Sequence, residues 1–189
     1  MTFSPGPNTM LTTAIAANDG FRRTLPFTLA VPVGWLFIMM ACGLGIGTLV
    51  TQMPIIRYLI QFLGCAYLIW LAFKLSQSSQ LKEVNLNKLN MGFFKGVIFQ
   101  FLNIKVWLLA LTITSAWVIH AEGIPSSNPE QRLIVSCVVM MCFAFASNMS
   151  YAIAGSVVRV WLSSGKRLLF FNRFLALILA LTALWTLTV

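Results

Sequence analysis

Residues 25–50 read LPFTLAVPVGWLFIMMACGLGIGTLV and contain no charged side chain. A helix that crosses the roughly 30 Å hydrocarbon core of a bilayer needs about 20 mostly apolar residues, so this stretch is long enough to span a membrane. Residues 133–158 form a second uncharged stretch of comparable length. Two such segments in one short chain predict a polytopic membrane protein.

The composition of the whole chain supports the same prediction. Of its 189 residues 59% are hydrophobic and 9% are charged, with a mean hydropathy of +0.86. An ordinary soluble domain carries about 25% charged residues, so the chain lacks the polar shell that a water-soluble enzyme needs. The 13 Lys and Arg residues are scattered between apolar runs rather than gathered in a patch. The net charge of +9 therefore does not indicate nucleic-acid binding.

Further apolar stretches bring the predicted number of transmembrane helices to six. The stretch from Gly96 to Ile119 is interrupted only by Lys105, and the first stretch is short and contains Pro5 and Pro7. We therefore predict an all-α polytopic membrane protein in a single transmembrane domain covering residues 1–189. Besides the two stretches above, the predicted spans are residues 1–18, 55–73, 96–119 and 168–189.

Lys and Arg residues are distributed unequally between the predicted connections. Only Arg57 and Arg132 flank the second and fourth connections. Because positive residues favour the cytoplasmic side, we expect the odd-numbered connections to be cytoplasmic and both termini to lie outside. The first, third and fifth connections carry Arg22, Arg23, Lys74, Lys82, Lys88, Lys95, Arg159, Lys166, Arg167 and Arg173.

The two halves of the chain, about residues 1–75 and 93–189, are weakly similar. A shift of 116 positions pairs Arg57 with Arg173 and Leu63 with Leu179. Between the halves, residues 76–92 form a polar segment that we expect to be a cytoplasmic loop. Two three-helix units in one chain enter the membrane from opposite sides, as in the inverted repeats of many secondary transporters, whose substrate site lies between the halves.

The run Ser4-Pro5-Gly6-Pro7-Asn8 places two prolines inside the first predicted span. Each proline removes a backbone donor, so a helix cannot continue through this run without a break. The positive end of the helix that resumes near Asn8 favours a carboxylate. The alternative is an ordinary helix start, because proline is common in the first turn.

Gln100, Asn103 and Lys105 occupy the corresponding place in the second half. Lys105 is ten residues after Lys95. At about 1.5 Å per residue it lies about 15 Å deep, near the middle of the bilayer. A cation at that depth suits an anionic group of a substrate; the alternative is a lysine that snorkels along a kinked helix.

A third polar group, Ser147-Asn148 with Ser150 and Tyr151, lies in the fifth predicted span. Its side chains can form hydrogen bonds with the amino group of a zwitterion. They can equally form bonds between helices, as Asn and Ser commonly do in membranes. Both interpretations stay open from the sequence.

Residues typical of metal or catalytic sites are not clustered. His120 has no Cys or His nearby, and the four cysteines lie in predicted spans without a C-x-x-C arrangement. We therefore expect no metal and no cofactor. The absence of clustered acids also argues against a membrane enzyme or a metal exporter.

These motifs resemble those of the LysE/RhtB family of bacterial amino-acid exporters. The proline run is followed by Asp19-Gly20-Phe21-Arg22, and residues 64–71 (GCAYLIWL) are similar to the family's third-helix pattern. Residues 99–105 (FQFLNIK) and 148–155 (NMSYAIAG) are most similar to the branch that exports cysteine and O-acetylserine. The resemblance implies a proton-coupled exporter of small neutral amino acids in the inner membrane.

In this interpretation the partners are an amino-acid substrate and the lipid bilayer, and homo-oligomerisation stays open. Lys105 and the broken helix would bind the carboxylate of the substrate, while Asn103 and Asn148 would orient its amino group. The broken helix contributes Ser4, Pro5, Gly6, Pro7 and Asn8.

The chain departs from the family pattern in two places. Relatives usually carry a longer segment before the proline run, so either the start lies upstream of Met1 or the first helix is incomplete. The second case would make the chain a non-transporting or degenerate membrane subunit. Many relatives also have an acid at the position of Asn148; if that acid carries the coupling proton, another group must do so here, or coupling is absent.

Overall fold

The computed structural model describes residues 6–78, 91–121, 124–162 and 166–187, and these residues are almost entirely helical. Besides the turns between helices, the described residues include a two-residue antiparallel pairing of β1 (His120–Ala121) with β2 (Ile124–Pro125). The expected all-helical architecture is therefore confirmed at this level. The helices are α1 (Pro7–Asp19), α2 (Phe21–Gly43), α3 (Gly47–Gln52), α4 (Pro54–Ser76), α5 (Phe93–Phe101), α6 (Ile104–Ile113), the π-helix η1 (Thr114–Ile119), α7 (Pro129–Leu162) and α8 (Arg167–Thr186).

Four of these helices, α2, α4, α7 and α8, are long and apolar enough to cross a membrane. The pair α5 and α6–η1 passes the same test jointly, although it is bent by 67°, and would make a fifth span. Helix α1 has 13 residues. At about 1.5 Å per residue it is about 20 Å long, shorter than the hydrocarbon core. The six-span count therefore remains a prediction.

Two glycines with positive φ mark sharp turns of the chain. Gly20, with φ of 89°, joins α1 to α2 in a turn where a side chain would be strained. Gly45, with φ of 86°, lies after α2. The stretch of residues 25–50 thus does not form one helix, because α2 ends at Gly43 and the chain turns before the short α3.

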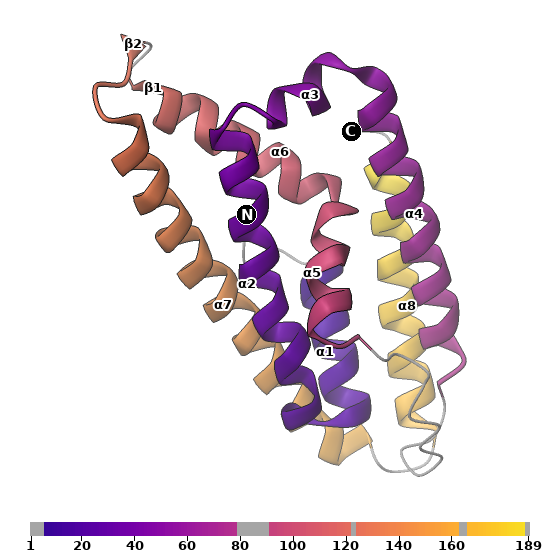
Figure 1. The fold of residues 1–189 in the computed structure, drawn as a ribbon. Helices are drawn as coiled ribbons and strands as arrows, with labels where there is room; N and C mark the ends of the chain where they lie inside the picture. The colour runs from indigo at the N-terminus through magenta and orange to yellow at the C-terminus, as the bar shows by residue number, and fades with distance from the viewer. Residues whose placement is uncertain (1–5, 79–90, 122–123, 163–165, 188–189) are drawn as a thin grey trace.

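The long helices pack in antiparallel pairs. Helix α2 runs along α7, and α4 runs along α8, while α1 packs against both α2 and α7 (Figure 1). The α1–α2 junction, the end of α4, the end of α7 and the start of α8 all lie at the lower end of the molecule in Figure 1. Helix α3 and the β1–β2 pair lie at the opposite end. The loop predicted over residues 76–92 falls mostly outside the described residues.

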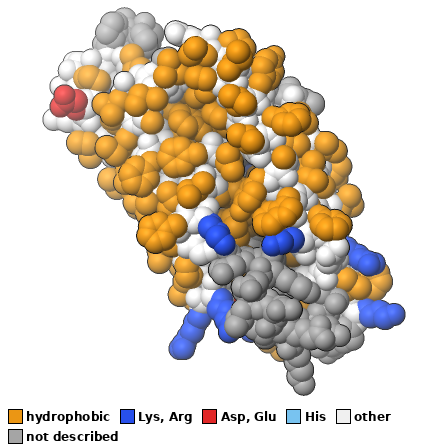
Figure 2. Space-filling model, turned by 45° about the vertical axis from the view of Figure 1, so that its right-hand side comes forward, with side chains coloured by type: hydrophobic (Ala, Val, Ile, Leu, Met, Phe, Trp, Pro, Cys, Tyr) orange, Lys and Arg blue, Asp and Glu red, His pale blue; other side chains and the backbone are white. Residues whose placement is uncertain are grey.

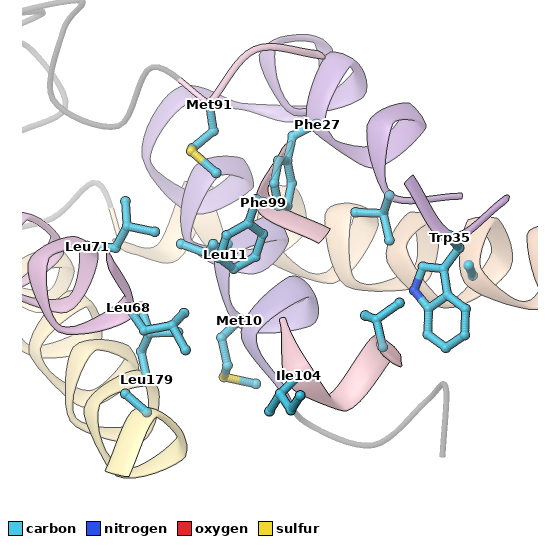
Figure 3. Close-up of a cluster of buried hydrophobic side chains, with 14 of the residues drawn as sticks. Met10, Leu11, Phe27, Trp35, Leu68, Leu71, Met91, Phe99, Ile104 and Leu179 are labelled. Atoms are coloured by element: carbon cyan, nitrogen blue, oxygen red, sulfur yellow. The ribbon is translucent and has the colours of Figure 1, made fainter. Parts of the chain in front are cut away.

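The face of the molecule shown in Figure 2 is largely apolar, and the Lys and Arg side chains visible on it lie toward its lower end. Large side chains such as Phe62, which is 72% exposed, face outward from the helices. An apolar surface of this extent suits lipid contact. Inside, Leu11 of α1 meets Phe27 of α2 and Phe99 of α5 in the core (Figure 3).

Candidate functional site

The fourth predicted span is broken between α5 and α6. Leu102 and Asn103 form the break, and Asn103 has the extended backbone of a helix N-cap, with φ of −96° and ψ of 94°. Breaking a helix frees carbonyl groups that must find other donors. The Phe101 carbonyl accepts a hydrogen bond of 3.0 Å from Trp107 Nε1. Gly64 of α4 lets the Leu102 carbonyl approach so closely that a Cβ at Gly64 would collide with it.

Helix α1 begins within the proline run. Gly6 is extended, with φ of −167°, and Pro7 is the first helical residue. The Gly6 amide donates a hydrogen bond of 3.0 Å to Thr9 Oγ1, which secures the start of the helix. Helices α1 and α6 thus begin at Pro7 and at Ile104, and the N–H groups of their first turns, of which Pro7 has none, lack acceptors within their own helices.

Both N-termini border one pocket. It offers about 40 Å³ to the centres of water molecules. One water needs about 10–15 Å³ by this measure, so the pocket has room for a small molecule. Its lining comes from α1, α2, α6, α7 and the two helix starts: Gly6, Pro7, Asn8, Thr9, Trp35, Asn103, Lys105, Val106, Leu109, Ala144 and Asn148.

Six of the eight residues that the sequence analysis predicted to bind substrate line this pocket, and they come from three separate parts of the chain. Ser4 and Pro5, the other two, lie outside the described residues. The six are Gly6, Pro7, Asn8, Asn103, Lys105 and Asn148.

Asn103 presents a hydrogen-bond acceptor that is not used. Its side chain is 5% exposed, and Oδ1 accepts no hydrogen bond from any described residue. Nor does the side chain cap α6, although an Asn at an N-cap usually does so. A buried acceptor without a donor costs free energy, so this atom is suited to a donor that enters the pocket.

Asn8 is fixed by Gln100 of α5. The Asn8 amide donates to Gln100 Oε1 at 2.8 Å, and Gln100 Nε2 donates back to Asn8 Oδ1 at 3.1 Å. Gln100 is fully buried and also donates to the Gly96 carbonyl at 3.0 Å. Gln100 therefore positions Asn8 and is not itself part of the lining.

The amide of Asn148 is engaged within the protein. Its Oδ1 accepts a hydrogen bond of 3.0 Å from Thr12 Oγ1, and its Nδ2 donates to the Ala144 carbonyl at 2.8 Å. Asn148 thus lines the pocket and ties α7 to α1, so the two interpretations of this residue are compatible. Ser150 is exposed on α7 and donates to the Ala146 carbonyl, away from the pocket.

Sequence reasoning missed five lining residues. Thr9 follows the proline run directly, and its position could have indicated a role. The other four are Trp35, Val106, Leu109 and Ala144, which lie in apolar runs that do not distinguish pocket-facing from lipid-facing positions.

The charge of the lining is positive. Lys105 is accompanied by the two helix N-termini, each of which carries a partial positive charge, and the lining contains no acid. Within the described ranges, no three His, Cys, Asp or Glu side chains come close enough to hold a metal ion. The site is therefore built to attract an anionic group between apolar helices.

A bundle of apolar helices with a small pocket of mixed polar and apolar lining beside a broken helix is typical of a membrane transporter. The chain matches the family "LysE type translocator" over residues 1–188 and belongs to that family. It is a translocator and not an enzyme, and the family expected from the motifs is confirmed.

Curated relatives cover nearly the whole chain. The cysteine/O-acetylserine efflux protein of Salmonella choleraesuis (strain SC-B67) is 29% identical over 181 residues, which are 95% of this chain and 88% of the relative. The protein of the same name from Escherichia coli (strain K12) is 29% identical over 182 residues, with the same coverage. No solved structure matches the chain.

Proposed function

We propose that the chain exports small neutral amino acids across the bacterial inner membrane, with cysteine and O-acetylserine as the first candidates. The names of its relatives support these two compounds. The observation that carries the proposal is the pairing of a positive lining with the unused Asn103 Oδ1 in one pocket. A zwitterionic amino acid has the anion and the donor that such a pocket requires.

The carboxylate of the substrate would bind at the positive part of the pocket. Lys105 supplies a full charge, and the first-turn amides of α1 and α6 supply donors on neighbouring sides. A charged hydrogen bond contributes about 1.5–3 kcal/mol, so loss of one such contact weakens binding roughly tenfold to a hundredfold. The proposal includes Ser4 and Pro5 together with Gly6, Pro7 and Asn8.

The amino group would donate to Asn103 Oδ1, which lacks another donor among the described residues. Asn148 Oδ1 retains a second lone pair beside its bond to Thr12 and can accept as well. The two amides come from α7 and from the break between α5 and α6. With the carboxylate held at the positive part of the pocket, these two contacts to the amino group would fix how the substrate lies in the pocket.

Alternating access would arise from rocking of two inverted three-helix repeats, about residues 1–75 and 93–189. The start of α6 then corresponds to the start of α1, and the pairs α2–α7 and α4–α8 relate the two halves. The pocket draws Asn8 from the first half and Lys105 from the second. Movement between the halves therefore changes the pocket directly.

We also propose coupling to the proton gradient, as the family resemblance implies. The lining contains no Asp, Glu or His, so among its described residues the titratable side chain is Lys105. Proteoliposomes with and without an imposed pH gradient distinguish the cases. Coupling predicts faster release of amino acid under the gradient, and equal rates would contradict it.

A pocket built from both halves supports transport over the alternative of a non-transporting subunit. The test is the release of cysteine and O-acetylserine from proteoliposomes that contain the full chain. Lys105→Ala should reduce release at least about tenfold, because a charged contact is lost. Lys95→Ala, which removes an exposed lysine from α5, is the matched control and should release at the normal rate. Unchanged release with Lys105→Ala would reject the proposed site.

A further inference from the structure

Part of the pocket lining is apolar. Trp35 of α2, Val106 and Leu109 of α6, and Ala144 of α7 line the same pocket as the polar groups. In the proposed function the polar groups hold the carboxylate and the amino group, which every amino acid has. The apolar lining then faces the part in which amino acids differ, the side chain.

Trp35 is the largest of these apolar residues. Its side chain is 5% exposed, and its ring lies away from the group formed by Leu11, Phe27 and Phe99 (Figure 3). Trp35 belongs to the same buried cluster as these residues and also lines the pocket.

The backbone next to Trp35 is held firmly in place. Gly34 lets α2 lie so close to α5 that an added Cβ would collide with the Gln100 side chain and stand 3.2 Å from the Val97 carbonyl. Gln100 in turn holds Asn8. The α2 backbone that carries Trp35 therefore packs against Gln100, the same residue that holds Asn8 at the start of α1.

The space left beside Trp35 is small. The whole pocket offers about 40 Å³ to water centres, a few times what one water needs. We propose that Trp35 determines specificity by limiting the substrate to amino acids with short side chains. This inference rests on the proposed function, and it assigns the size limit to one residue.

The test uses proteoliposomes of the full chain loaded with an equimolar mixture of serine, cysteine, methionine and leucine, with release followed by mass spectrometry. Trp35→Ala should raise the ratio of methionine and leucine release to cysteine release at least about tenfold, since one methylene in a tight apolar pocket discriminates about 10- to 200-fold. Trp35→Phe keeps an aromatic wall and should shift the ratio much less.

A second variant tests the limit in the opposite direction and does not depend on the stability of Trp35→Ala. Ala144 is 1% exposed, and Ala144→Val adds bulk to the same apolar lining. This variant should still release serine, and the ratio of cysteine release to serine release should fall. An unchanged ratio would overturn the inference, even if Trp35→Ala fails to accumulate.

The matched control is Met39→Ala, which empties a fully buried position on α2 outside the pocket. It should alter yield without changing the release ratios. Trp35→Ala with normal accumulation and unchanged ratios would overturn the role of Trp35 while leaving the proposed function intact. Loss of all release with both Trp35 variants would also overturn it. If the unaltered chain released no amino acid, the proposed function itself would fail.

Discussion

Asn103 and Asn148 carry the same amide group, but among the described residues only the Asn148 oxygen accepts a hydrogen bond. Asn148 bonds to Thr12 and to the Ala144 carbonyl, whereas Asn103 Oδ1 is buried without a donor among the described residues. A buried polar atom that the fold leaves unsatisfied is retained at a cost in stability. We infer that Asn103 Oδ1 is kept without a partner among the described residues because it binds the amino group of the substrate.

Asn103→Leu should separate function from stability. Leucine has nearly the same size but offers no acceptor, and no described hydrogen bond is lost. We expect release of amino acid to fall at least about tenfold, since a hydrogen bond to a charged group contributes about 1.5–3 kcal/mol. The melting temperature in detergent should stay the same or rise.

The matched control for this substitution is Gln61→Leu. Gln61 is buried between α4 and α8, and its amide donates to the Thr186 carbonyl at 3.1 Å. This variant should lower the melting temperature, because it removes an internal bond, while release per folded molecule stays normal. A lower melting temperature for Asn103→Leu with normal release would refute the assignment.

Gly64→Ala tests the close approach at the break. An added Cβ would collide with the Leu102 carbonyl, which is backbone and cannot turn away. Overpacking of this kind costs about 1–3 kcal/mol, so we expect a lower melting temperature and reduced release. Gly92→Ala, where a Cβ would meet nothing within 4 Å, should be neutral. Equal melting temperatures for the two variants would show that the approach at Gly64 is not tight.

Helix α1 connects the two halves of the chain. Each of its long-range side-chain hydrogen bonds among the described residues joins it to the second half or to Ser78, which lies between the halves. Asn8 pairs with Gln100, Thr12 bonds to Asn148, and Asn18 pairs with Asn172 of α8. The last pair is reciprocal, at 2.8 and 2.9 Å, and Ser78 joins it by donating to Asn18 Oδ1 at 3.0 Å. Rocking of the halves must break or carry along these bonds.

A double-mutant cycle on Asn18→Ala and Asn172→Ala measures the strength of one of these interhelical hydrogen-bonded pairs, which lies away from the pocket. We expect a coupling of about 0.5–1.5 kcal/mol in the free energy of unfolding, because interhelical hydrogen bonds in membranes contribute amounts of this size. A coupling of zero would show that the reciprocal pair does not hold α1 to α8.

The sequence predicted the start of α1 better than it predicted the break between α5 and α6. Pro5 and Pro7 indicate that a helix begins near Asn8, because proline removes donors, and α1 begins at Pro7; whether a helix precedes it lies outside the described residues. The break before Ile104 contains no proline or glycine, and the sequence there predicts one span interrupted only by Lys105. This break depends on contacts distant in sequence, such as Gly64 with Leu102, which local patterns do not reveal.

At the scale of the whole molecule, hydropathy sufficed to predict the class of protein, whereas the assignment of the connections to a side of the membrane stays a prediction from charge. The α1–α2 junction and the adjoining ends of α4, α7 and α8 lie at one end, as the Lys and Arg distribution indicates (Figure 1). The apolar lining of the pocket was not predictable, because Trp35 and Leu109 lie in runs where every position is apolar. Only tertiary packing separates lipid-facing from pocket-facing positions there.

The sidedness of the molecule remains a proposal with a direct test. Gln77→Cys and Ser127→Cys each place a thiol at an exposed position; the first follows the end of α4 and the second precedes the start of α7, and these two helix ends lie at opposite ends of the molecule (Figure 1). If the odd connections are cytoplasmic, an impermeant maleimide should label Cys at position 127 in spheroplasts. Position 77 should be labelled only after permeabilisation. The reverse pattern would invert the proposed orientation.

The central claim is that the positive part of the pocket binds the carboxylate of a small amino acid. Displacement of labelled cysteine from the purified full chain by cysteine or by cysteamine, which lacks the carboxylate, tests it most directly. We predict that cysteamine binds at least about tenfold more weakly, and that Lys105→Ala removes most of this difference. Equal displacement by the two compounds from the unaltered protein would contradict the account.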